Sequence, residues 1–126
     1  MLVLDSGGVS RLARRDSGTA ALVRALRRQG LWPPVVPTLV LAECLTGSPD
    51  KDANTNWLLK NCTIQTAVSE RVARRAGYLR TRARRGSAVD ALVVAVAEPG
   101  STVLTGDRAD LEALAAHAVD VTIEVV

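Results

Sequence analysis

The acidic residues of this sequence fall where metal-dependent chemistry would need them. Asp5 ends an apolar segment, Asp107 closely follows another, and Asp110 lies one helical turn later. Glu43 and Asp90 each lie in an apolar segment without a polar face, and no Lys or Arg adjoins either of them in the sequence. An ionised carboxylate in such surroundings costs several kcal/mol unless it is paired. A bound divalent cation is therefore the expected partner of these acids.

The available donors indicate a hard cation. Carboxylate oxygens without a usable histidine suit Mg²⁺ or Mn²⁺ rather than Zn²⁺. The only histidine, His117, falls near a helix end, where we expect it to be solvated. Such ions activate water and neutralise phosphate charge in phosphoryl chemistry. We therefore expect one or two Mg²⁺ or Mn²⁺ ions per site.

Helix capping is a competing explanation for some of these acids. Asp107 is a natural N-cap with Asp110 as its capping-box partner, and Asp90 is the third residue after Ser87, which is also a box position. Asp5 and Glu43 are harder to explain in this way, because Asp5 ends an otherwise apolar strand and Glu43 lies inside an apolar helix.

Alternating strands and helices position these residues. Apolar runs between turn signals predict strands at residues 1–5, 31–37, 62–66, 102–105 and 121–125. Apolar periodicity and stop signals predict helices at residues 9–15, 17–29, 39–46, 52–60, 69–84, 88–98 and 107–117. We expect Ser17 and Thr38 to cap the second and third helices, and residues 6–8 to form a turn.

This alternation predicts an α/β fold, namely a three-layer α-β-α sandwich with a mostly parallel central sheet of about five strands. The sequence contains no internal repeat and no linker, so we interpret residues 1–126 as a single domain. In such a sheet, ligands bind outside the carboxyl ends of the strands. The acids described above all fall at or near that edge.

Composition excludes several functional classes. Hydrophobic residues make up 48% and charged residues 23% of the 126 residues, which is typical of globular proteins. No apolar run reaches the about 20 residues of a membrane span, and no secretion signal is recognisable. Two cysteines cannot build a disulfide framework, so we expect a cytoplasmic protein. Three aromatic residues are too few for a base-stacking platform.

Four motifs in register resemble the PIN-domain family, and the resemblance covers the whole chain. They are the strand ending in Asp5-Ser6, the segment Thr38-Leu39-Val40-Leu41-Ala42-Glu43, the segment Asp90-Ala91-Leu92 after Ser87, and the segment from Thr105 to Leu111. The length is most similar to that of VapC-type toxins of bacterial and archaeal toxin–antitoxin pairs. The resemblance implies a metal-dependent endoribonuclease that cleaves single-stranded or looped RNA, acts as the toxin of a type II pair, and is inhibited by a cognate antitoxin.

The resemblance also implies roles for individual residues. The catalytic quartet of the family is matched by Asp5, Glu43, Asp90 and Asp107. Metal ligands would be Asp5, Asp90 and one of the pair Asp107 and Asp110, with Glu43 acting on a metal-bound water. The supporting hydroxyl residues are matched by Ser6 and Thr105. The chain departs from the family pattern in having Gly7-Gly8 directly after Ser6.

Arginine is concentrated in one expected helix. The net charge is +3, and seven arginines lie between residues 71 and 85. A solvated helix face explains such a run in part, but the guanidinium also binds phosphate or carboxylate with two donors. The expected surface for RNA or antitoxin consists of Arg71, Arg74, Arg75, Arg82 and Arg85.

Two other functions stay open. The same fold could serve a housekeeping RNA-processing nuclease without an antitoxin, or a PIN domain that binds RNA or protein without catalysis. The complete acidic set argues against the second, since a pure binder has no need of buried carboxylates. We expect a homodimer and a toxin–antitoxin hetero-oligomer, with Trp32 and Trp57 in the core or in dimer contacts.

Overall fold

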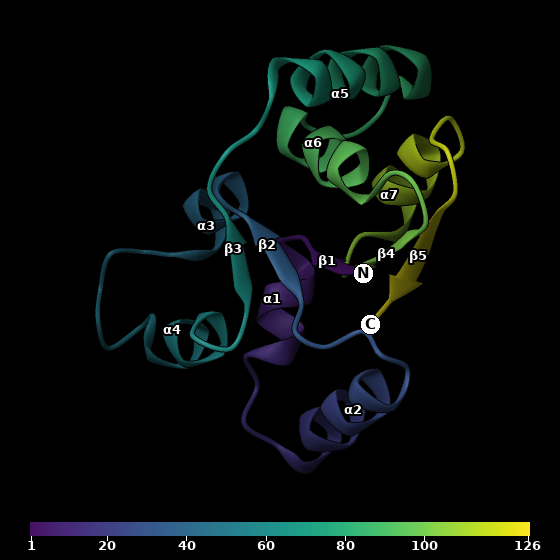
Figure 1. The fold of residues 1–126 in the computed structure, drawn as a ribbon. Coiled ribbons are helices and arrows are strands. Elements are labelled where there is room, and N and C mark those ends of the chain that lie inside the picture. Colours follow the sequence, from purple (N-terminus) through teal and green to yellow (C-terminus); the bar gives the residue numbers. More distant parts are fainter.

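The computed structural model describes residues 1–126 and contains five strands and seven helices (Figure 1). The strands are β1 (Leu2–Leu4), β2 (Val35–Pro37), β3 (Thr63–Gln65), β4 (Ser101–Thr105) and β5 (Val121–Val125). The helices are α1 (Ser6–Leu12), α2 (Ser17–Arg28), α3 (Thr38–Cys44), α4 (Ala53–Leu59), α5 (Glu70–Ala83), α6 (Ala88–Ala97) and α7 (Arg108–Ala115). Every expected strand and helix is present, and the ends differ from the expected ones by a few residues.

The strands form one sheet in the order β3-β2-β1-β4-β5, and every neighbouring pair is parallel. The expected mostly parallel sheet is thus wholly parallel. β1 lies at the centre, where Val3 pairs with Val35 on one side and with Val103 on the other. The strand order reverses at β1, and such a reversal opens a crevice at the carboxyl edge of the sheet.

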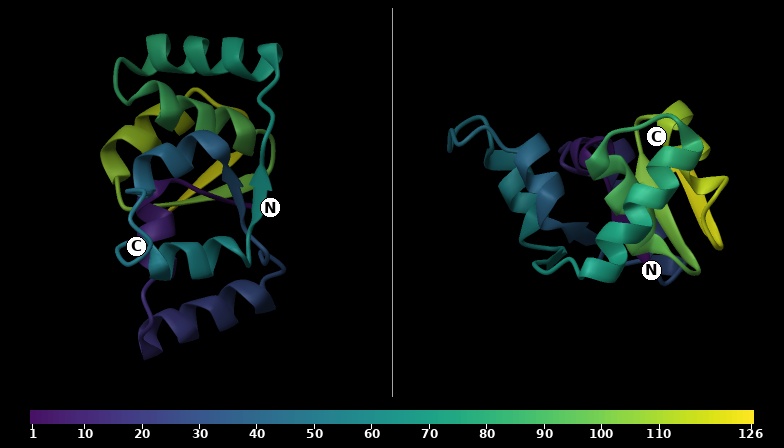
Figure 2. Two further views of the ribbon diagram at one scale, coloured as in Figure 1. Left: turned by 90° about the vertical axis from the view of Figure 1, so that its left-hand side faces the viewer. Right: turned by 90° about the horizontal axis from the view of Figure 1, so that it is seen from above.

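Helices cover both faces of the sheet and complete three layers. α6 packs on β1 and β4, with α5 outside it and α7 beside it. α1 packs on β4 from the opposite face and contacts α2, α3 and α4. Figure 2 shows α5 and α2 as the outermost helices at opposite ends of the molecule. The architecture is the α-β-α sandwich that the sequence predicts.

The buried centre of the molecule consists mainly of β1 and α6. Leu2, Val3 and Leu4 have no solvent exposure, and the last five residues of α6 are buried. These residues belong to one cluster of 22 buried apolar residues. Full burial of each Leu or Val side chain contributes roughly 1.5–3 kcal/mol to stability. This packing fixes β1 immediately before Asp5.

Side-chain caps define where five of the helices begin. In each case a side-chain oxygen accepts a hydrogen bond from a backbone N–H in the first turn, which is worth about 1 kcal/mol. The capping residues are Asp5, Asp16, Ser69, Ser87 and Asp107. Three of these caps are acidic, and two of those acids are also candidate site residues.

Two expected caps are corrected by the structure. Asp16, rather than Ser17, caps α2, because its Oδ1 accepts bonds from both the backbone N–H and the hydroxyl of Thr19. Thr38 is the first residue of α3 rather than its cap, and the preceding Pro37 makes no side-chain bond. A carboxylate oxygen has lone pairs for both donors of Thr19, which favours the earlier residue as the cap of α2.

The Gly7-Gly8 pair is helical, where the sequence predicted a turn. Both glycines lie in the first turn of α1, which packs against β4. A Cβ atom on Gly8 would lie 2.3 Å from the carbonyl oxygen of Leu104, and one on Gly7 would lie 2.5 Å from the backbone nitrogen of Gly106. Glycine at both positions therefore allows the start of α1 to lie directly against the carboxyl end of β4.

β2 is shorter than the expected strand at residues 31–37, because it begins only at Val35. Pro33 and Pro34 precede it, and proline has no N–H to donate to a neighbouring strand. The carbonyl of Pro34 still accepts a bond from the N–H of Thr63 at 2.8 Å, so the pairing with β3 starts at this residue.

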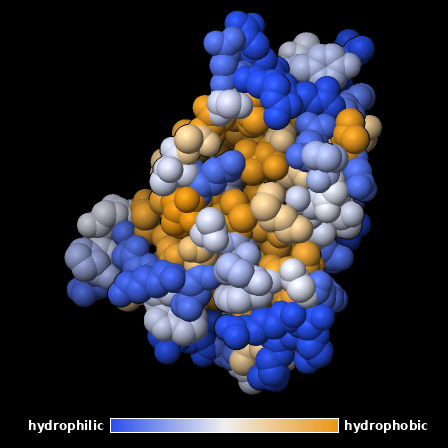
Figure 3. All heavy atoms as spheres, in the orientation of Figure 1, coloured by the Kyte–Doolittle hydropathy of each residue, from blue (hydrophilic) through white to orange (hydrophobic).

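The surface separates into apolar and charged regions. Apolar side chains gather at the middle of the face shown in Figure 3, between hydrophilic α5 at the top and α2 at the bottom. Because α2 and α5 lie at opposite ends, their arginines lie at the two ends of the molecule.

None of the helices combines the length and the apolar character that crossing a lipid bilayer requires.

Candidate functional site

Asp5 lies at the carboxyl end of β1, where both of its carboxylate oxygens are held. Oδ1 accepts a hydrogen bond from the backbone N–H of Gly8 at 2.8 Å, and Oδ2 accepts one from the hydroxyl of Thr105, the last residue of β4. Asp5 is 5% exposed and Thr105 is fully buried. The two central strands therefore present one oriented carboxylate at the point where the strand order reverses.

Asp90 and Glu43 approach this carboxylate from two helices. Asp90 is half-buried in the first turn of α6, and Glu43 lies near the end of α3. Burial is the main cause of the raised pKa of Asp5 and of Glu43, and the charge of Asp90 raises both further. Like charges shift a pKa in this way only when the groups are neighbours. Asp5, Asp90 and Glu43, three of the four expected catalytic acids, thus lie near enough for their charges to interact.

Opposing effects act on the pKa of Asp5. Burial raises the pKa of Asp5, because the charged carboxylate loses its hydration. Hydrogen bonds from Thr105 and Gly8 favour the charged form and oppose this rise, whereas the charge of Asp90 adds to it. A cation beside Asp5 would offset both the lost hydration and the repulsion.

Glu43 is exposed, although the sequence predicted that it is buried. Of the residues of α3 only Val40 is buried, and Leu39 is 39% exposed. The helix is short and packs mainly on α1 and β2, so its other apolar residues stay in contact with solvent. Partial loss of hydration raises the pKa of Glu43, followed by the charges of Asp90 and Asp5. A cation at Glu43 would therefore offset both the partial loss of hydration and the repulsion from Asp90 and Asp5.

Asp90 has the structural role that its position after Ser87 suggests. Its backbone N–H donates to Ser87 Oγ at 3.1 Å, and its Oδ2 accepts from the backbone N–H of Ser87 at 3.0 Å, which completes a capping box. Only one carboxylate oxygen is used in this way. Oδ1 of Asp90 therefore stays available for another ligand.

Asp107 and Asp110 extend the site along the start of α7. The backbone N–H of Asp107 donates to Thr105 Oγ1 at 2.9 Å, and Oδ1 of Asp107 accepts from the backbone N–H of Asp110 at 3.2 Å. Asp110 does not complete the expected capping box. Its Oδ1 accepts a bond from Nε of Arg85 at 2.9 Å instead. Asp110 thus contacts Arg85, which is 25 residues away in the sequence, instead of the backbone at the start of its own helix.

The two expected supporting hydroxyls differ in what they contact. Thr105 donates to Asp5 and accepts from the backbone of Asp107, so it links two of the acids. Ser6 is the half-buried first residue of α1, and the donors that hold Asp5 come from Gly8 and Thr105 instead. The geometry therefore assigns the supporting contact to Thr105.

The acid cluster has no cationic partner within the chain. We define the acid cluster as Asp5, Glu43, Asp90 and Asp107. The ion pairs of the protein use other acids, namely Glu70, Glu98, Asp110 and Glu112. No group of three or more His, Cys, Asp or Glu side chains lies in an arrangement that could hold a metal ion. The donor chemistry fits Mg²⁺ or Mn²⁺, because the acid cluster offers only carboxylate oxygens.

The expected arginine surface divides into a structural residue and exposed ones. Arg75 donates from Nε and Nη2 to the two carboxylate oxygens of Glu98, each at 2.8 Å, and Glu98 also accepts from the backbone of Val119. Arg75 thus holds α5 to the end of α6. Arg74 forms an ion pair only with exposed Glu70. Such pairs contribute about 0–1 kcal/mol, so phosphate can replace them easily. Arg71 and Arg82 are exposed on the same helix.

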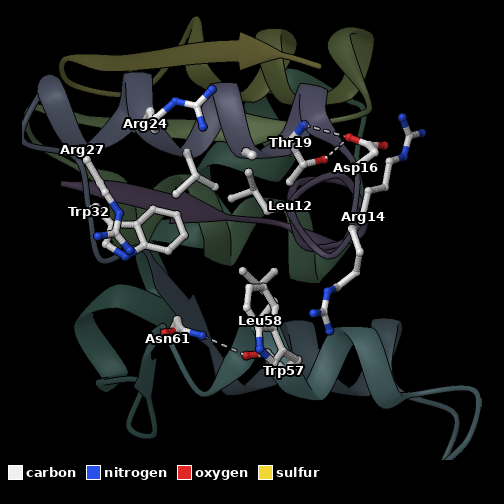
Figure 4. Close-up of a pocket in the computed structure, with 13 residues that line it drawn as sticks. Leu12, Arg14, Asp16, Thr19, Arg24, Arg27, Trp32, Trp57, Leu58 and Asn61 are labelled. Carbon is white, nitrogen blue, oxygen red and sulfur yellow. Dashed lines mark hydrogen bonds between the residues drawn. The ribbon is translucent and has the colours of Figure 1, made fainter.

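A groove of about 500 Å³ lies between α2 and α4, with the end of α1 as its floor (Figure 4). Leu12 and Leu58 line it, together with Trp32 and Trp57. Its rim is basic, because four arginines line the groove against the single acid Asp16. These arginines are Arg14, Arg15, Arg24 and Arg27.

Each tryptophan of the groove is covered by an arginine. The guanidinium of Arg15 lies 4.6 Å from the ring centre of Trp57, and that of Arg27 lies 5.3 Å from Trp32. Trp57 is 48% exposed, so it is not a core residue. Sequence reasoning missed this groove, because Arg15 and Trp57 are far apart in the chain and no periodic pattern connects them.

Comparison with known proteins yields structural neighbours alone. No protein-family model and no curated protein matches the sequence. The chain is similar to the crystal structure of FitAcB from Neisseria gonorrhoeae, with a TM-score of 0.64 and 19% identity over 97% of this chain and 96% of that chain. It is also similar to PAE2754 from Pyrobaculum aerophilum, with a TM-score of 0.62 and 16% identity over 97% and 89% of the two chains. The fold is PIN-like.

Neutralising Asp5 should stabilise the metal-free protein, and the gain should depend on pH. The pKa of Asp5 is raised above its ordinary 3.8. The folded state therefore binds the proton of the Asp5 carboxyl group more tightly than the unfolded state does. Protonation of Asp5 stabilises the folded protein fully below the pKa of the unfolded state, and this stabilisation is lost as the pH rises through the pKa of the folded state. Asp5→Asn should thus melt at a higher temperature than the unmodified protein at about pH 7, and the difference should shrink towards about pH 4.

Thermal unfolding followed by circular dichroism in EDTA measures this difference. Acids with a lowered pKa, such as Glu98, lose stabilising interactions on acidification and are present in both proteins, so the comparison cancels them. Mg²⁺ or Mn²⁺ should then raise the melting temperature of the unmodified protein more than that of the variant. A difference that is independent of pH and of metal would show that neither burial nor repulsion destabilises the ionised carboxylate of Asp5.

Proposed function

We propose that the protein is a metal-dependent endoribonuclease that acts as the toxin of a type II toxin–antitoxin pair. The observation that supports this proposal best is the acid cluster at the switch point of the sheet. Burial and then the charge of Asp90 raise the pKa of Asp5 and of Glu43 there, and no cation from the chain pairs with a member of the cluster. The comparisons support the proposal at the level of the fold, which the chain shares with FitAcB and PAE2754.

In this proposal, Asp5, Asp90 and Asp107 hold Mg²⁺ or Mn²⁺. Asp5 is oriented by Thr105 and Gly8, and Asp90 has one free oxygen. Asp110 is the weaker candidate of the last pair, because its carboxylate binds Arg85. The bound ion would supply activation of water and neutralisation of the phosphate.

Glu43 is the proposed general base of the reaction. Its pKa is raised, and a base whose pKa lies closer to the working pH transfers protons more effectively. Its exposed position at the rim of the acid cluster leaves its carboxylate accessible to a water molecule and to RNA. Glu43 would accept the proton of the attacking water on a carboxylate oxygen.

Incubation of purified protein with a pool of single-stranded RNA tests the nuclease proposal. We expect internal cleavage with Mg²⁺ or Mn²⁺ and none in EDTA, and sequencing of the new RNA ends would identify the cleaved positions. Growth arrest on expression would favour a toxin over a housekeeping nuclease. A protein that cleaves no RNA with either ion would contradict the proposal.

We propose further that the antitoxin binds the groove between α2 and α4 with an acidic, apolar segment. The supporting observation is the combination of an apolar floor with four arginines on the rim. A basic residue at the tip of the antitoxin would fit the acid cluster and compete with metal there. The antitoxin should therefore carry mixed charge.

Charge reversal on the rim of the groove should release the ribonuclease from its antitoxin. Arg27→Glu should weaken antitoxin binding by about tenfold or more, since a close pair of like charges in an interface costs several kcal/mol. Arg28→Glu, on the same helix but outside the groove, is the matched control. Titration calorimetry with the protein encoded beside this chain gives both affinities, and RNA cleavage should be equal in the two variants. Equal affinities would place the antitoxin elsewhere.

A further inference from the structure

Arg85 is the arginine that the fold holds beside the acid cluster. Its Nε binds Asp110 at 2.9 Å, on the first turn of the helix that Asp107 caps. The other ion pairs hold arginines away from the acid cluster. Arg108, which follows Asp107, pairs with Glu112 further along α7. Arg74 and Arg75 pair with Glu70 and Glu98, which are not members of the acid cluster. RNA that enters an acidic site needs such a positioned cation.

A continuous chain of hydrogen bonds connects the deepest acid to Arg85. The hydroxyl of Thr105 donates to Asp5, and the same oxygen accepts from the backbone N–H of Asp107 at 2.9 Å. Asp107 in turn accepts from the backbone N–H of Asp110 at 3.2 Å, and Asp110 accepts from Arg85. Asp110, which holds the Arg85 guanidinium, is therefore linked through Asp107 to Thr105, one of the two residues that orient Asp5.

The backbone around Arg85 also fixes its direction. Arg84 ends α5 in the left-handed conformation with a φ of 55°, and Gly86 follows with a φ of 86°. A Cβ atom on Gly86 would lie 3.6 Å from Cβ of Asp90 and 2.8 Å from Cδ1 of Leu114. The chain thus turns tightly against α6 and α7. Gly86, the residue after Arg85, therefore lies against Asp90, and the Arg85 side chain binds Asp110.

We infer that Arg85 is a phosphate-binding residue of the proposed ribonuclease, and that Asp110 positions it rather than binding metal. This inference rests on the proposed function. Only Nε of Arg85 is bonded within the protein, and the side chain is 57% exposed. The two terminal nitrogens are free to donate to two oxygens of one phosphate. Arg85 would bind an RNA phosphate next to the one that is cleaved.

RNA binding without metal tests the role of Arg85 separately from catalysis. Single-stranded RNA is titrated in EDTA at several salt concentrations with the unmodified protein, Arg85→Gln and Arg84→Gln. Arg84 is the control, because it is an exposed neighbour without an ion pair. We expect Arg85→Gln to weaken binding about tenfold and to reduce the slope of log K against log salt by about 0.7. Arg84→Gln should change both much less.

Asp110→Asn separates positioning from charge and from metal binding. The loss of one negative charge should by itself strengthen RNA binding by the variant. The variant also loses the contact that positions Arg85, so its kcat should fall about tenfold. The rise in melting temperature with Mg²⁺ should be the same as in the unmodified protein. Arg85→Lys should restore little activity, because an ammonium cannot form the two parallel bonds.

The outcomes distinguish this inference from the proposed function. If the unmodified protein binds and cleaves RNA but Arg85→Gln behaves like Arg84→Gln, the role of Arg85 is wrong and the ribonuclease proposal stands. If Asp110→Asn abolishes the stabilisation by Mg²⁺, Asp110 is a metal ligand and the positioning role is wrong. If the unmodified protein neither binds nor cleaves RNA, both are wrong. Circular dichroism melting of each variant verifies that it is folded.

Discussion

Asp5→Asn should abolish metal-dependent cleavage of RNA and leave the fold intact. Asparagine keeps the shape of the side chain, and its oxygen can still cap α1 by accepting from the N–H of Gly8. It lacks the negative charge that a divalent cation requires of its ligand. We expect a loss of at least about a hundredfold in kcat, the scale on which single catalytic groups contribute.

Initial rates with Mg²⁺ or Mn²⁺, together with circular dichroism spectra, measure this prediction. Asp16→Asn is the matched control, because Asp16 also caps a helix through its side chain but belongs to the groove rather than to the acid cluster. Asp16→Asn should retain RNA cleavage and should still arrest growth on expression, whereas Asp5→Asn should do neither. Full activity of Asp5→Asn in a normally folded protein would falsify the assignment of Asp5 as a metal ligand.

The parts of the structure that the sequence predicts well are those encoded locally. β1 is an apolar run directly before Asp5, and its burial follows from composition alone. The capping box of α6 follows from the spacing of Ser87 and Asp90. Strand and helix alternation is sufficient for the parallel sheet, since parallel strands need crossover connections. With the sheet in place, Asp5 and Thr105 must meet, because they end adjacent central strands.

The parts that sequence reasoning predicts poorly depend on contacts across the fold. An all-apolar α3 suggests burial, yet Glu43 is exposed because this short helix has neighbours on only some of its sides. The Gly7-Gly8 pair suggests a turn, because the sequence does not reveal the close approach of β4. Asp110 suggests a capping box, but the turn after α5 brings Arg85 to it. In each case the deciding neighbour lies elsewhere in the sequence.

Gly8→Ala should be among the most destabilising single substitutions at the site. The added Cβ would lie 2.3 Å from the carbonyl oxygen of Leu104 and 3.1 Å from its carbonyl carbon. The opposing atoms are backbone, so no side-chain rotation can relieve the overlap, and α1 must move away from β4. We expect a loss of about 3 kcal/mol in the free energy of unfolding, at the upper end of overpacking effects. Because the N–H of Gly8 holds Oδ1 of Asp5 at 2.8 Å, RNA cleavage should fall as well.

Gly77→Ala is the matched control, because its stability should change in the opposite direction. Gly77 also lies inside a helix, α5, but nothing lies within 4 Å of the position of its added Cβ. Alanine at an unobstructed helical position favours the helix by about 0.5–1 kcal/mol over glycine. Urea unfolding of the two variants should therefore shift the midpoint in opposite directions, downwards for Gly8→Ala and upwards for Gly77→Ala. If Gly8→Ala is as stable as the unmodified protein, α1 does not lie against the end of β4, and the contact that orients Asp5 must be different.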